Sequence, residues 1–264
     1  MSENKLPWAN KNLGQHFLRD MKVIESICGD FAQEAEAILE IGPGPGILTE
    51  HLAKHPLPFQ VIEKDKRFPE YLTQFISEDQ INIEDAMKVY FEKFFEEKEF
   101  SGKKVWLVSN LPYNVGTPLL VSFLQAPTIK YMTLMFQKEV ALKVYTTKSS
   151  LMSLCQTYFE AKLLCNVPPG AFQPPPKVDS AVVTLVRREN PVIPLEEFRK
   201  FEKFLRKLYQ MKRKQVGKVL KPFYEKEFLE ACLEKAGAKR TDRAEIFNLE
   251  QVQLLYKLLE KQEE

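Results

Sequence analysis

The sequence predicts an α/β fold in which a Rossmann-like domain with an open, largely parallel sheet is followed by a smaller all-helical C-terminal domain. Between residues 37 and 190, short apolar runs alternate with segments of helical spacing, a pattern typical of βα units. A glycine-rich loop follows the first apolar run, and after Arg188 the chain is rich in helix formers, with no convincing strand. We therefore place the domains at residues 1–190 and 191–264.

Six apolar runs have the length and composition of strands that are buried on both faces, as in a parallel sheet. They are Ala37–Ile41, Phe59–Ile62, Gln80–Ile83, Val105–Ser109, Tyr131–Phe136 and Ala181–Val186. The stretch Phe172–Lys177 before the last run contains three consecutive prolines, which lack the N–H that a helix or a central strand needs. We expect it to be a rigid loop.

The bulk composition is that of an ordinary globular protein. The chain has 264 residues, a formal net charge of +2 and 44% hydrophobic residues, which suffices for a sizeable core. No apolar run approaches the roughly 20 residues that span a bilayer, and the four cysteines are scattered without metal-ligand spacing. We expect a cytoplasmic monomer with reduced, mostly buried thiols, without a membrane segment or a metal site.

One segment of the helical domain is strongly basic. Residues 199–221 contain ten Lys or Arg but a single acid, Glu202. An ordinary solvated helix surface is the alternative, but so one-sided a run in a balanced chain favours a face that binds phosphates. The candidate contacts to nucleic acid are Lys212, Arg213 and Lys214.

The glycine loop and the acid that follows the next strand predict a nucleotide site. Gly42, Gly44 and Gly46 lie between the first strand and a helix start, where backbone N–H groups can approach a ligand closely. A dinucleotide fingerprint needs its third glycine at position 47, which is Ile47, so this spacing disfavours NAD. Glu63 directly follows the next predicted strand, at a place where a carboxylate can accept hydrogen bonds from both ribose hydroxyls.

Asp85 follows the third predicted strand at the same edge of the sheet. Its carboxylate could accept a hydrogen bond from an adenine amino group. The alternative is an N-cap of the helix that begins near Ala86, and the two roles are compatible.

The tetrapeptide Asn110–Tyr113 stands at the end of the fourth predicted strand, the edge where α/β sheets bind ligands. The lone pair of an adenine N6 amine is delocalised into the ring, so the amine attacks a sulfonium methyl group poorly. The Asn110 side-chain oxygen and the Pro112 carbonyl could hold both amine hydrogens while Tyr113 stacks on the base. A plain turn is the alternative. Phe172 is the candidate for a second aromatic wall, against simple core packing.

Together these residues closely resemble the ribosomal RNA adenine dimethyltransferase family, whose bacterial members dimethylate two adjacent adenosines near the 3′ end of small-subunit RNA. The likeness covers nearly the whole chain. Its motifs are Asn12–Leu18, Glu40–Gly46, Val61–Asp65, Glu84–Met87, Asn110–Asn114, Gln137–Val140, Pro174–Ser180 and Arg243–Glu245.

The resemblance implies a Rossmann-like domain that uses S-adenosylmethionine to give N6,N6-dimethyladenosine, with the small ribosomal subunit and its 16S rRNA as partners. It also implies that the N-terminal segment folds over the donor site. The implied cofactor contacts are His16, Leu18, Gly42, Gly44, Glu63, Asp85 and Asn110.

The sequence departs from the family pattern at two places. The segment 141–152, expected as a loop near the RNA, is shorter than usual, and Met211–Lys218 has lysines where the family has arginines, which bind phosphate in a bidentate way. One alternative function is a large-subunit adenine N6-methyltransferase of the macrolide-resistance type, although these enzymes usually carry Ile at the place of Leu111. The other is a non-enzymatic RNA-binding assembly factor.

Overall fold

The computed structural model describes residues 15–211 and 213–260. The chain divides into two compact units, of which the first contains residues up to 141 together with 161–187. The second contains 142–160 and the chain from 188 onward. The sequence boundary at 190 had left 142–160 in the first domain, so the helical unit is assembled from two separate stretches of the chain.

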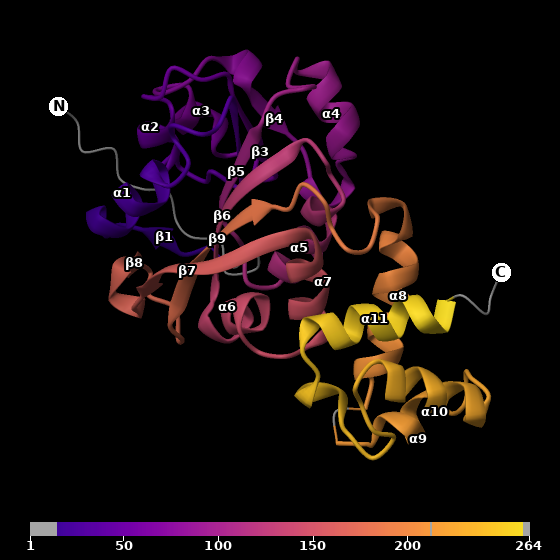
Figure 1. The fold of residues 1–264 in the computed structure, drawn as a ribbon. Coiled ribbons are helices and arrows are strands. Elements are labelled where there is room, and N and C mark those ends of the chain that lie inside the picture. Colours follow the sequence, from indigo (N-terminus) through magenta and orange to yellow (C-terminus); the bar gives the residue numbers. More distant parts are fainter. Residues whose placement is uncertain (1–14, 212, 261–264) are drawn as a thin grey trace. The chain divides into compact units, whose positions relative to one another are not determined.

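A mixed seven-stranded sheet forms the centre of the first unit (Figure 1). Five neighbouring strands, β4 to β6 in sheet order, are parallel, whereas β9 pairs antiparallel with β6. All six predicted strands are confirmed. In sheet order the strands are β4 Ile81–Ile83, β3 Phe59–Glu63, β2 Ala37–Ile41, β5 Val105–Asn110, β6 Ile129–Gln137, β9 Ser180–Arg187 and β7 Phe159–Val167.

The sequence analysis missed the edge strand β7. Its exposed positions include Glu160 and Lys162, charges that interrupt the continuous apolar run expected of a central strand. Charged side chains are common on edge strands because they discourage pairing with other chains.

A second sheet joins the start of the described chain to the proline-rich stretch. Strand β1 (Phe17–Leu18) pairs antiparallel with β8 (Phe172–Gln173). The prolines follow β8 as a loop, as predicted, after a cis Gln173–Pro174 peptide bond. This pairing holds residues 15–18 close to the proline-rich loop.

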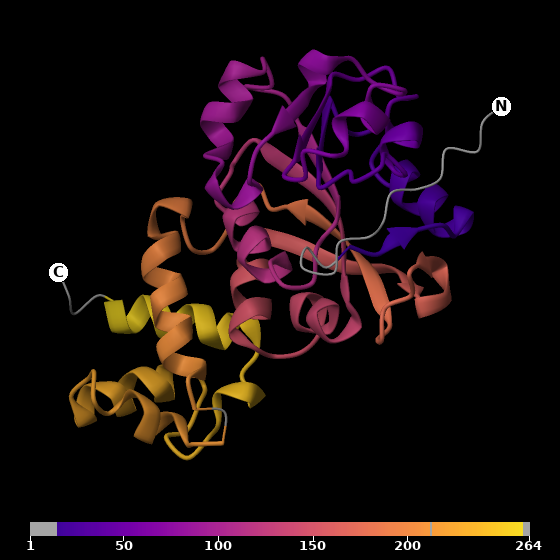
Figure 2. The ribbon, with the colours of Figure 1, turned by 180° about the vertical axis from the view of Figure 1, so that it is seen from behind.

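Helices cover both faces of the large sheet. In Figures 1 and 2, α2 and α3 lie on one side of the strands and α4 on the other. The helix α1 begins after Asp20, whose carboxylate accepts the N–H groups of Lys22 and Val23 at 3.0 and 3.3 Å. The helices of this unit are α1 Met21–Gly29, α2 Thr49–Leu52, α3 Pro69–Leu72, α4 Phe91–Glu97 and α5 Gly116–Leu124, with short 3-10 turns at Glu78–Gln80, Ala86–Lys88 and Pro169–Ala171.

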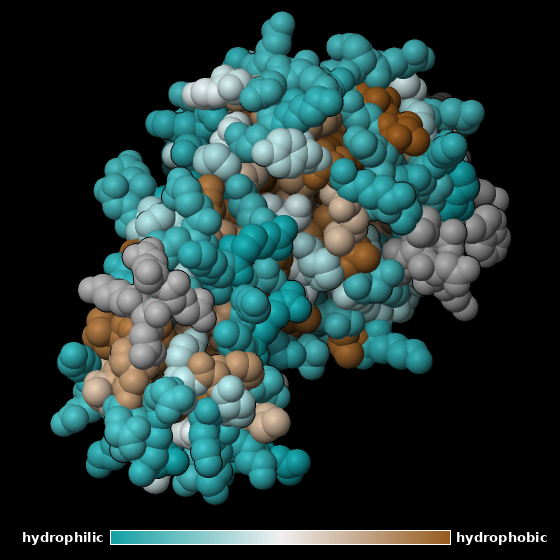
Figure 3. Space-filling model, turned by 90° about the vertical axis from the view of Figure 1, so that its right-hand side faces the viewer, coloured by the Kyte–Doolittle hydropathy of each residue, from teal (hydrophilic) through white to brown (hydrophobic). Residues whose placement is uncertain are grey.

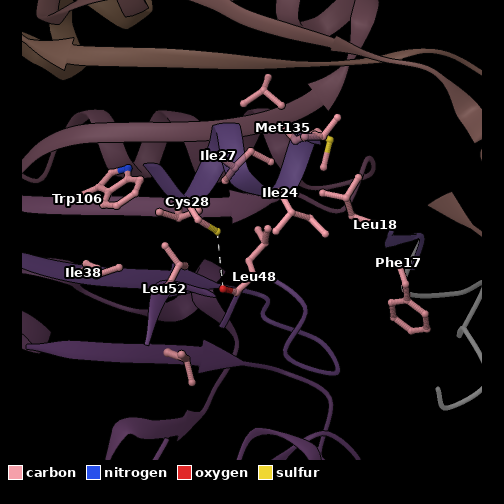
Figure 4. Packing of buried hydrophobic residues seen from close by; sticks show 14 of the residues in the cluster. Phe17, Leu18, Ile24, Ile27, Cys28, Ile38, Leu48, Leu52, Trp106 and Met135 are labelled. Carbon is pink, nitrogen blue, oxygen red and sulfur yellow. Dashed lines mark hydrogen bonds between the residues drawn. The ribbon is translucent and has the colours of Figure 1, made fainter. Parts of the chain in front are cut away.

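The core between α1 and the sheet is largely apolar. Figure 4 shows Ile24 and Ile27 of α1 packed toward Trp106 and Met135 of the strands. Cys28 belongs to this cluster, where its thiol lies 3.8 Å from the Leu48 carbonyl oxygen and burial raises its pKa. Three of the four cysteines are buried and all are free, as expected; the fourth, Cys165, is half-buried.

The second unit is helical, as predicted. Phe201 and Phe204 of the amphipathic helix α8 pack against Tyr256 of α11, and Gln253 donates to the buried Thr157 hydroxyl at 2.9 Å. Its elements are α7 Ser150–Tyr158, a 3-10 turn Leu195–Glu197, α8 Phe198–Tyr209, α9 Val216–Leu220, α10 Lys226–Lys235, a 3-10 turn Ala244–Ile246 and α11 Leu249–Glu260.

The segment 141–152, expected as a loop, is mostly helical. It contains the end of α6 (Lys138–Tyr145) and the start of α7, which Ser149 caps by accepting the Met152 N–H at 3.2 Å. The Lys148 ammonium donates to the Ile246 carbonyl at 2.8 Å. None of the described helices is long and apolar enough to cross a membrane.

Candidate active site

A pocket of about 260 Å³ opens at the carboxyl ends of the parallel strands, where α/β sheets bind ligands. Nearly all the residues that the sequence nominated for catalysis and cofactor binding line it. These residues are His16, Leu18, Gly42, Gly44, Glu63, Asp85, Asn110, Pro112 and Tyr113.

The glycines of the glycine loop serve two different purposes. Gly42 has a φ of +67°, and a Cβ built there would meet nothing within 4 Å, so this position leaves open space at the pocket. Gly46 has a φ of +93°, and a Cβ there would lie 2.8 Å from the Phe75 ring. The first glycine keeps the backbone accessible to a ligand, whereas the last allows close packing.

Glu63 is a buried carboxylate fixed by the backbone. Its two oxygens accept the N–H groups of Gly44 and Asp65 at 2.9 and 2.7 Å. Burial raises its pKa, and hydrogen bonds from the backbone of Asp65, Gly44 and Lys64 oppose that rise. The carboxylate keeps lone-pair capacity for a ligand hydroxyl, so the geometry fits the predicted ribose contact.

The sequence analysis did not foresee the roles of Asp65 and Arg67. Asp65, whose N–H binds Glu63, is itself held by Arg67. The Arg67 guanidinium binds the Asp65 carboxylate with its Nε at 2.9 Å and its terminal nitrogen at 2.5 Å, and holds the Asp65 pKa at about 2. The Gln15 amide donates to the same carboxylate at 3.0 Å. The N-terminal segment is thereby attached to the donor side of the pocket.

Asp85 caps the turn that follows β4. Its carboxylate accepts the Met87 N–H at 3.1 Å, which confirms the capping role. Its other oxygen pairs with the Lys64 ammonium at 2.9 Å, and this pairing lowers the Asp85 pKa. Asp85 is therefore an ionised acceptor at the pocket wall, and its contact to an adenine stays a prediction.

Glu40 is a pocket residue that the sequence analysis had noted only as part of a motif. It is 1% exposed, accepts the Thr49 hydroxyl at 2.7 Å and has a pKa raised to about 8 by burial. Glu40 therefore holds a proton at neutral pH. The sequence did offer a sign of this buried acid, because Glu40 is the single polar residue in the apolar run Ala37–Ile41.

The Asn110 amide is oriented by the N-terminal segment. Its nitrogen donates to the His16 carbonyl at 3.1 Å, which leaves the amide oxygen as the acceptor toward the pocket. The Pro112 carbonyl already accepts the Val115 N–H at 3.1 Å and retains one lone pair. Two acceptors thus stand on one short loop, as the predicted chemistry requires.

Tyr113 is held on two sides. Its hydroxyl forms a 2.7 Å hydrogen bond with the buried Ser180 hydroxyl, and the His16 ring stacks on its ring with centroids 5.5 Å apart. His16 is fixed in turn, because its Nδ1 donates to the Pro174 carbonyl at 2.9 Å. The sequence analysis noted Ser180 and Pro174 only as the ends of a motif and not as site residues, since both lie far from Tyr113 along the chain.

Phe172 does not line this pocket, in contrast to its expected place as a second aromatic wall. Its side chain is 3% exposed and belongs to the core, because strand β8 pairs there with β1. Phe172 therefore packs in the core, which was the alternative considered for it. A stacking role would require this strand pair to move.

The nominated basic residues lie in the other unit. Arg213 and Lys214 are exposed, and Lys212 lies outside the described residues. Among the described residues, no group of three or more His, Cys, Asp or Glu could hold a metal ion.

The pocket combines a glycine loop, an acid at the end of the next strand and an Asn-Leu-Pro-Tyr loop, all at one edge of the sheet. This combination defines a Rossmann-like methyltransferase whose donor contains a nucleoside. The family model described as ribosomal RNA adenine dimethylase matches residues 8–261. The chain belongs to this family and is an enzyme of the rRNA adenine-methylating type.

The curated relatives cover nearly the whole chain. The chain is 38% identical to the ribosomal RNA small subunit methyltransferase A of Pseudomonas aeruginosa, over 88% of this chain and 89% of the relative. It is 34% identical to the protein of the same name in Clostridium botulinum, over 92% and 90%.

Two solved structures share the fold. The 23S rRNA methyltransferase ErmE is 28% identical with a TM-score of 0.70, over 92% of this chain and 99% of its own. A dimethyladenosine transferase from Plasmodium falciparum has a TM-score of 0.74 at 23% identity, over 94% and 98%. The predicted fold class is therefore confirmed.

Proposed function

We propose that the protein methylates the N6 amines of two adjacent adenosines near the 3′ end of 16S rRNA in the small ribosomal subunit. The observation that carries the chemistry is the Asn110 amide, whose nitrogen is bound to His16 and whose oxygen is left as an acceptor beside Tyr113. The choice of small-subunit RNA rests on the curated relatives, which are named for that subunit at 34–38% identity. The ErmE structure, named for 23S rRNA, is 28% identical.

The donor side of the pocket suits S-adenosylmethionine, which supplies a sulfonium-bound methyl group. Glu63 would accept the ribose hydroxyls, and Asp85 would accept the adenine amino group. Gly42 leaves the open space that a ligand lying along the loop needs. Leu18 would cover the donor from the N-terminal segment.

The acceptor side activates the target amine by hydrogen bonding. The Asn110 oxygen and the Pro112 carbonyl each accept one amine hydrogen, which favours a tetrahedral nitrogen with a localised lone pair. The Tyr113 ring provides the face on which the extruded base stacks. No strong general base is needed, because the methylated nitrogen loses its proton readily.

The helical unit supplies the second RNA contact in this proposal. Its residues 199–221 carry ten cations, among them the exposed Arg213 and Lys214. An rRNA substrate would place the protein in the cytoplasm, and we propose that it acts as a monomer.

The test is methylation of purified, unmethylated ribosomal subunits with labelled donor. We expect label in the small subunit at N6,N6-dimethyladenosine, identified by mass spectrometry of nucleosides. The Asn110→Ala variant should lower the rate by at least about 100-fold while calorimetry shows donor affinity changed by less than about threefold.

The matched variant Asn110→Asp separates orientation from acceptance. It keeps an acceptor oxygen but loses the N–H that binds the His16 carbonyl. We expect it to fall between the wild type and Asn110→Ala. Label confined to the large subunit, or unchanged turnover in Asn110→Ala, would contradict the proposal.

A further inference from the structure

The turn after α9 exposes an aromatic ring in the helical unit. The Phe223 N–H donates to the Leu220 carbonyl at 2.9 Å and closes the turn. Tyr224 points inward and is 9% exposed, whereas its neighbour Phe223 is 45% exposed. The turn thus presents a large apolar ring to solvent. Single exposed apolar side chains are common on protein surfaces, so the case for a binding site depends on the cation that lies against this ring.

A cation from α8 lies against this ring. The Lys207 ammonium is 4.9 Å from the Phe223 ring centroid and 5.9 Å from that of Tyr224. Such a cation–π contact restrains the ring and places a positive charge beside an exposed π face. The pairing offers both stacking and charge to a ligand.

The segment 199–221 that leads to Phe223 carries uncompensated positive charge. Arg199 and Arg206 of α8 share one carboxylate, that of Glu202, so only one of their two charges is balanced. By contrast, several other lysines of the same segment form no ion pair with any residue that the structure describes. They are Lys200, Lys203, Lys207, Lys218 and Lys221.

Hydrophilic side chains cover most of the face drawn in Figure 3, and hydrophobic ones reach the surface only in places. An exposed ring that contacts the unpaired Lys207, at the end of a lysine-rich segment, fits a polyanion that also carries flat bases, because phosphates bind the cations and a base stacks on the ring. A protein interface would instead be expected to place apolar neighbours around the ring and fewer lysines.

We propose that Phe223, backed by Lys207, is a stacking site for an unpaired base of RNA, with Lys203 and Lys221 as its phosphate contacts. The proposal rests on the RNA substrate of the proposed function and adds to it a base contact outside the methylation pocket. Stacking on an aromatic ring tolerates every base, so this site would contribute affinity rather than sequence choice.

The test measures binding of a short single-stranded oligoribonucleotide to the full chain by fluorescence anisotropy. Phe223→Ala should raise the dissociation constant about 5- to 100-fold, and Phe223→Trp should restore binding. The control Leu254→Ala removes a side chain with a similar exposure of 43% in the same unit and should change binding by less than about twofold. Base stacking should quench the emission of the indole introduced by Phe223→Trp, whereas inorganic polyphosphate should not.

Equal binding by Phe223→Ala and the wild type overturns the proposal, as does equal loss in Leu254→Ala or quenching by polyphosphate. Undetectable oligonucleotide binding by the wild type overturns it too. The methylation assay on ribosomal subunits is scored separately. A failed proposed function therefore appears as unlabelled small subunits, whatever the oligonucleotide result.

Discussion

The two sides of the pocket are held in place by different parts of the chain. On the donor side, Gly42, Glu63 and Asp85 stand at the ends of successive parallel strands, and backbone N–H groups of the loops at these neighbouring ends fix the two acids. On the acceptor side, Asn110 is oriented by a residue 94 positions away, and Tyr113 by one 67 positions away. One side follows from the sheet itself, and the other from contacts between distant segments.

Because the two sides are held in place differently, substitutions on each side of the pocket should have different effects. Changes on the donor side act through a carboxylate or the loop backbone, so they should alter ligand affinity directly. Changes on the acceptor side act through side-chain orientation and should alter the rate with little effect on donor affinity.

The largest effect is expected for Glu63→Gln on the donor side. A carboxylate accepts the N–H groups of both Gly44 and Asp65, whereas an amide turns an NH2 group toward one of them. The donor should bind about 100-fold more weakly, which corresponds to about 2.7 kcal/mol. Isothermal titration calorimetry with S-adenosylhomocysteine measures this change.

The control is Glu70→Gln, which removes the same charge at an exposed position of α3. It should leave the affinity unchanged. If Glu63→Gln binds the donor as tightly as this control, the ribose contact is wrong. If instead the rate falls at constant affinity, the division between the two sides fails.

Glu40 should make the stability of the protein depend on pH. Its folded pKa of about 8 exceeds the ordinary value of 4.5, so the folded state retains a proton that the unfolded chain loses. The free energy of unfolding therefore falls as the pH rises from 4.5 through 8, and levels off above it. Between about pH 6.5 and 8 the loss should be about 2 kcal/mol.

Urea unfolding of the wild type and Glu40→Gln measures this loss. The variant carries no titrating group at this position, and its amide oxygen can still accept the Thr49 hydroxyl. The free energy of unfolding of Glu40→Gln should therefore lack the loss of about 2 kcal/mol that is expected for the wild type between about pH 6.5 and 8. Parallel pH profiles for the two proteins would show that Glu40 is ionised in the folded state.

The donor side was predictable from the sequence because its determinants are local. A strand, a glycine loop and an acid at the next strand end are read within residues 37–63, and parallel pairing brings those ends together. Glu40 shows the limit of this reasoning. Its charge was visible in the apolar run, but the burial that raises its pKa depends on how helices and strands pack around it.

The acceptor side was predictable in its residue types but not in its supports. The sequence nominated Asn110 and Tyr113, yet nothing local links them to His16, Ser180 or Pro174. The same reason explains the place of Phe172, since its pairing partner β1 is a two-residue strand without a recognisable pattern. Likewise, no local pattern in 142–160 indicates that this segment packs with the C-terminal helices, although it belongs to the helical unit.

The smallest effect is expected for Ser180→Ala on the acceptor side. The change removes the 2.7 Å hydrogen bond that fixes the Tyr113 hydroxyl, in a position with no exposure to solvent. The stacking ring should lose orientation, and the methylation rate should fall about tenfold, equivalent to about 1.4 kcal/mol. Donor affinity by calorimetry should stay within about twofold.

A double-mutant cycle with Tyr113→Phe separates positioning from general loss of packing. If Ser180 acts through the phenol oxygen, Ser180→Ala should lower the rate in the wild type but have almost no further effect in the Tyr113→Phe background. A tenfold loss in both backgrounds would assign the effect to packing of β9 instead. Weakened donor binding in Ser180→Ala would show that the two sides of the pocket are coupled, because the hydrogen bond of this hydroxyl is made to the acceptor loop.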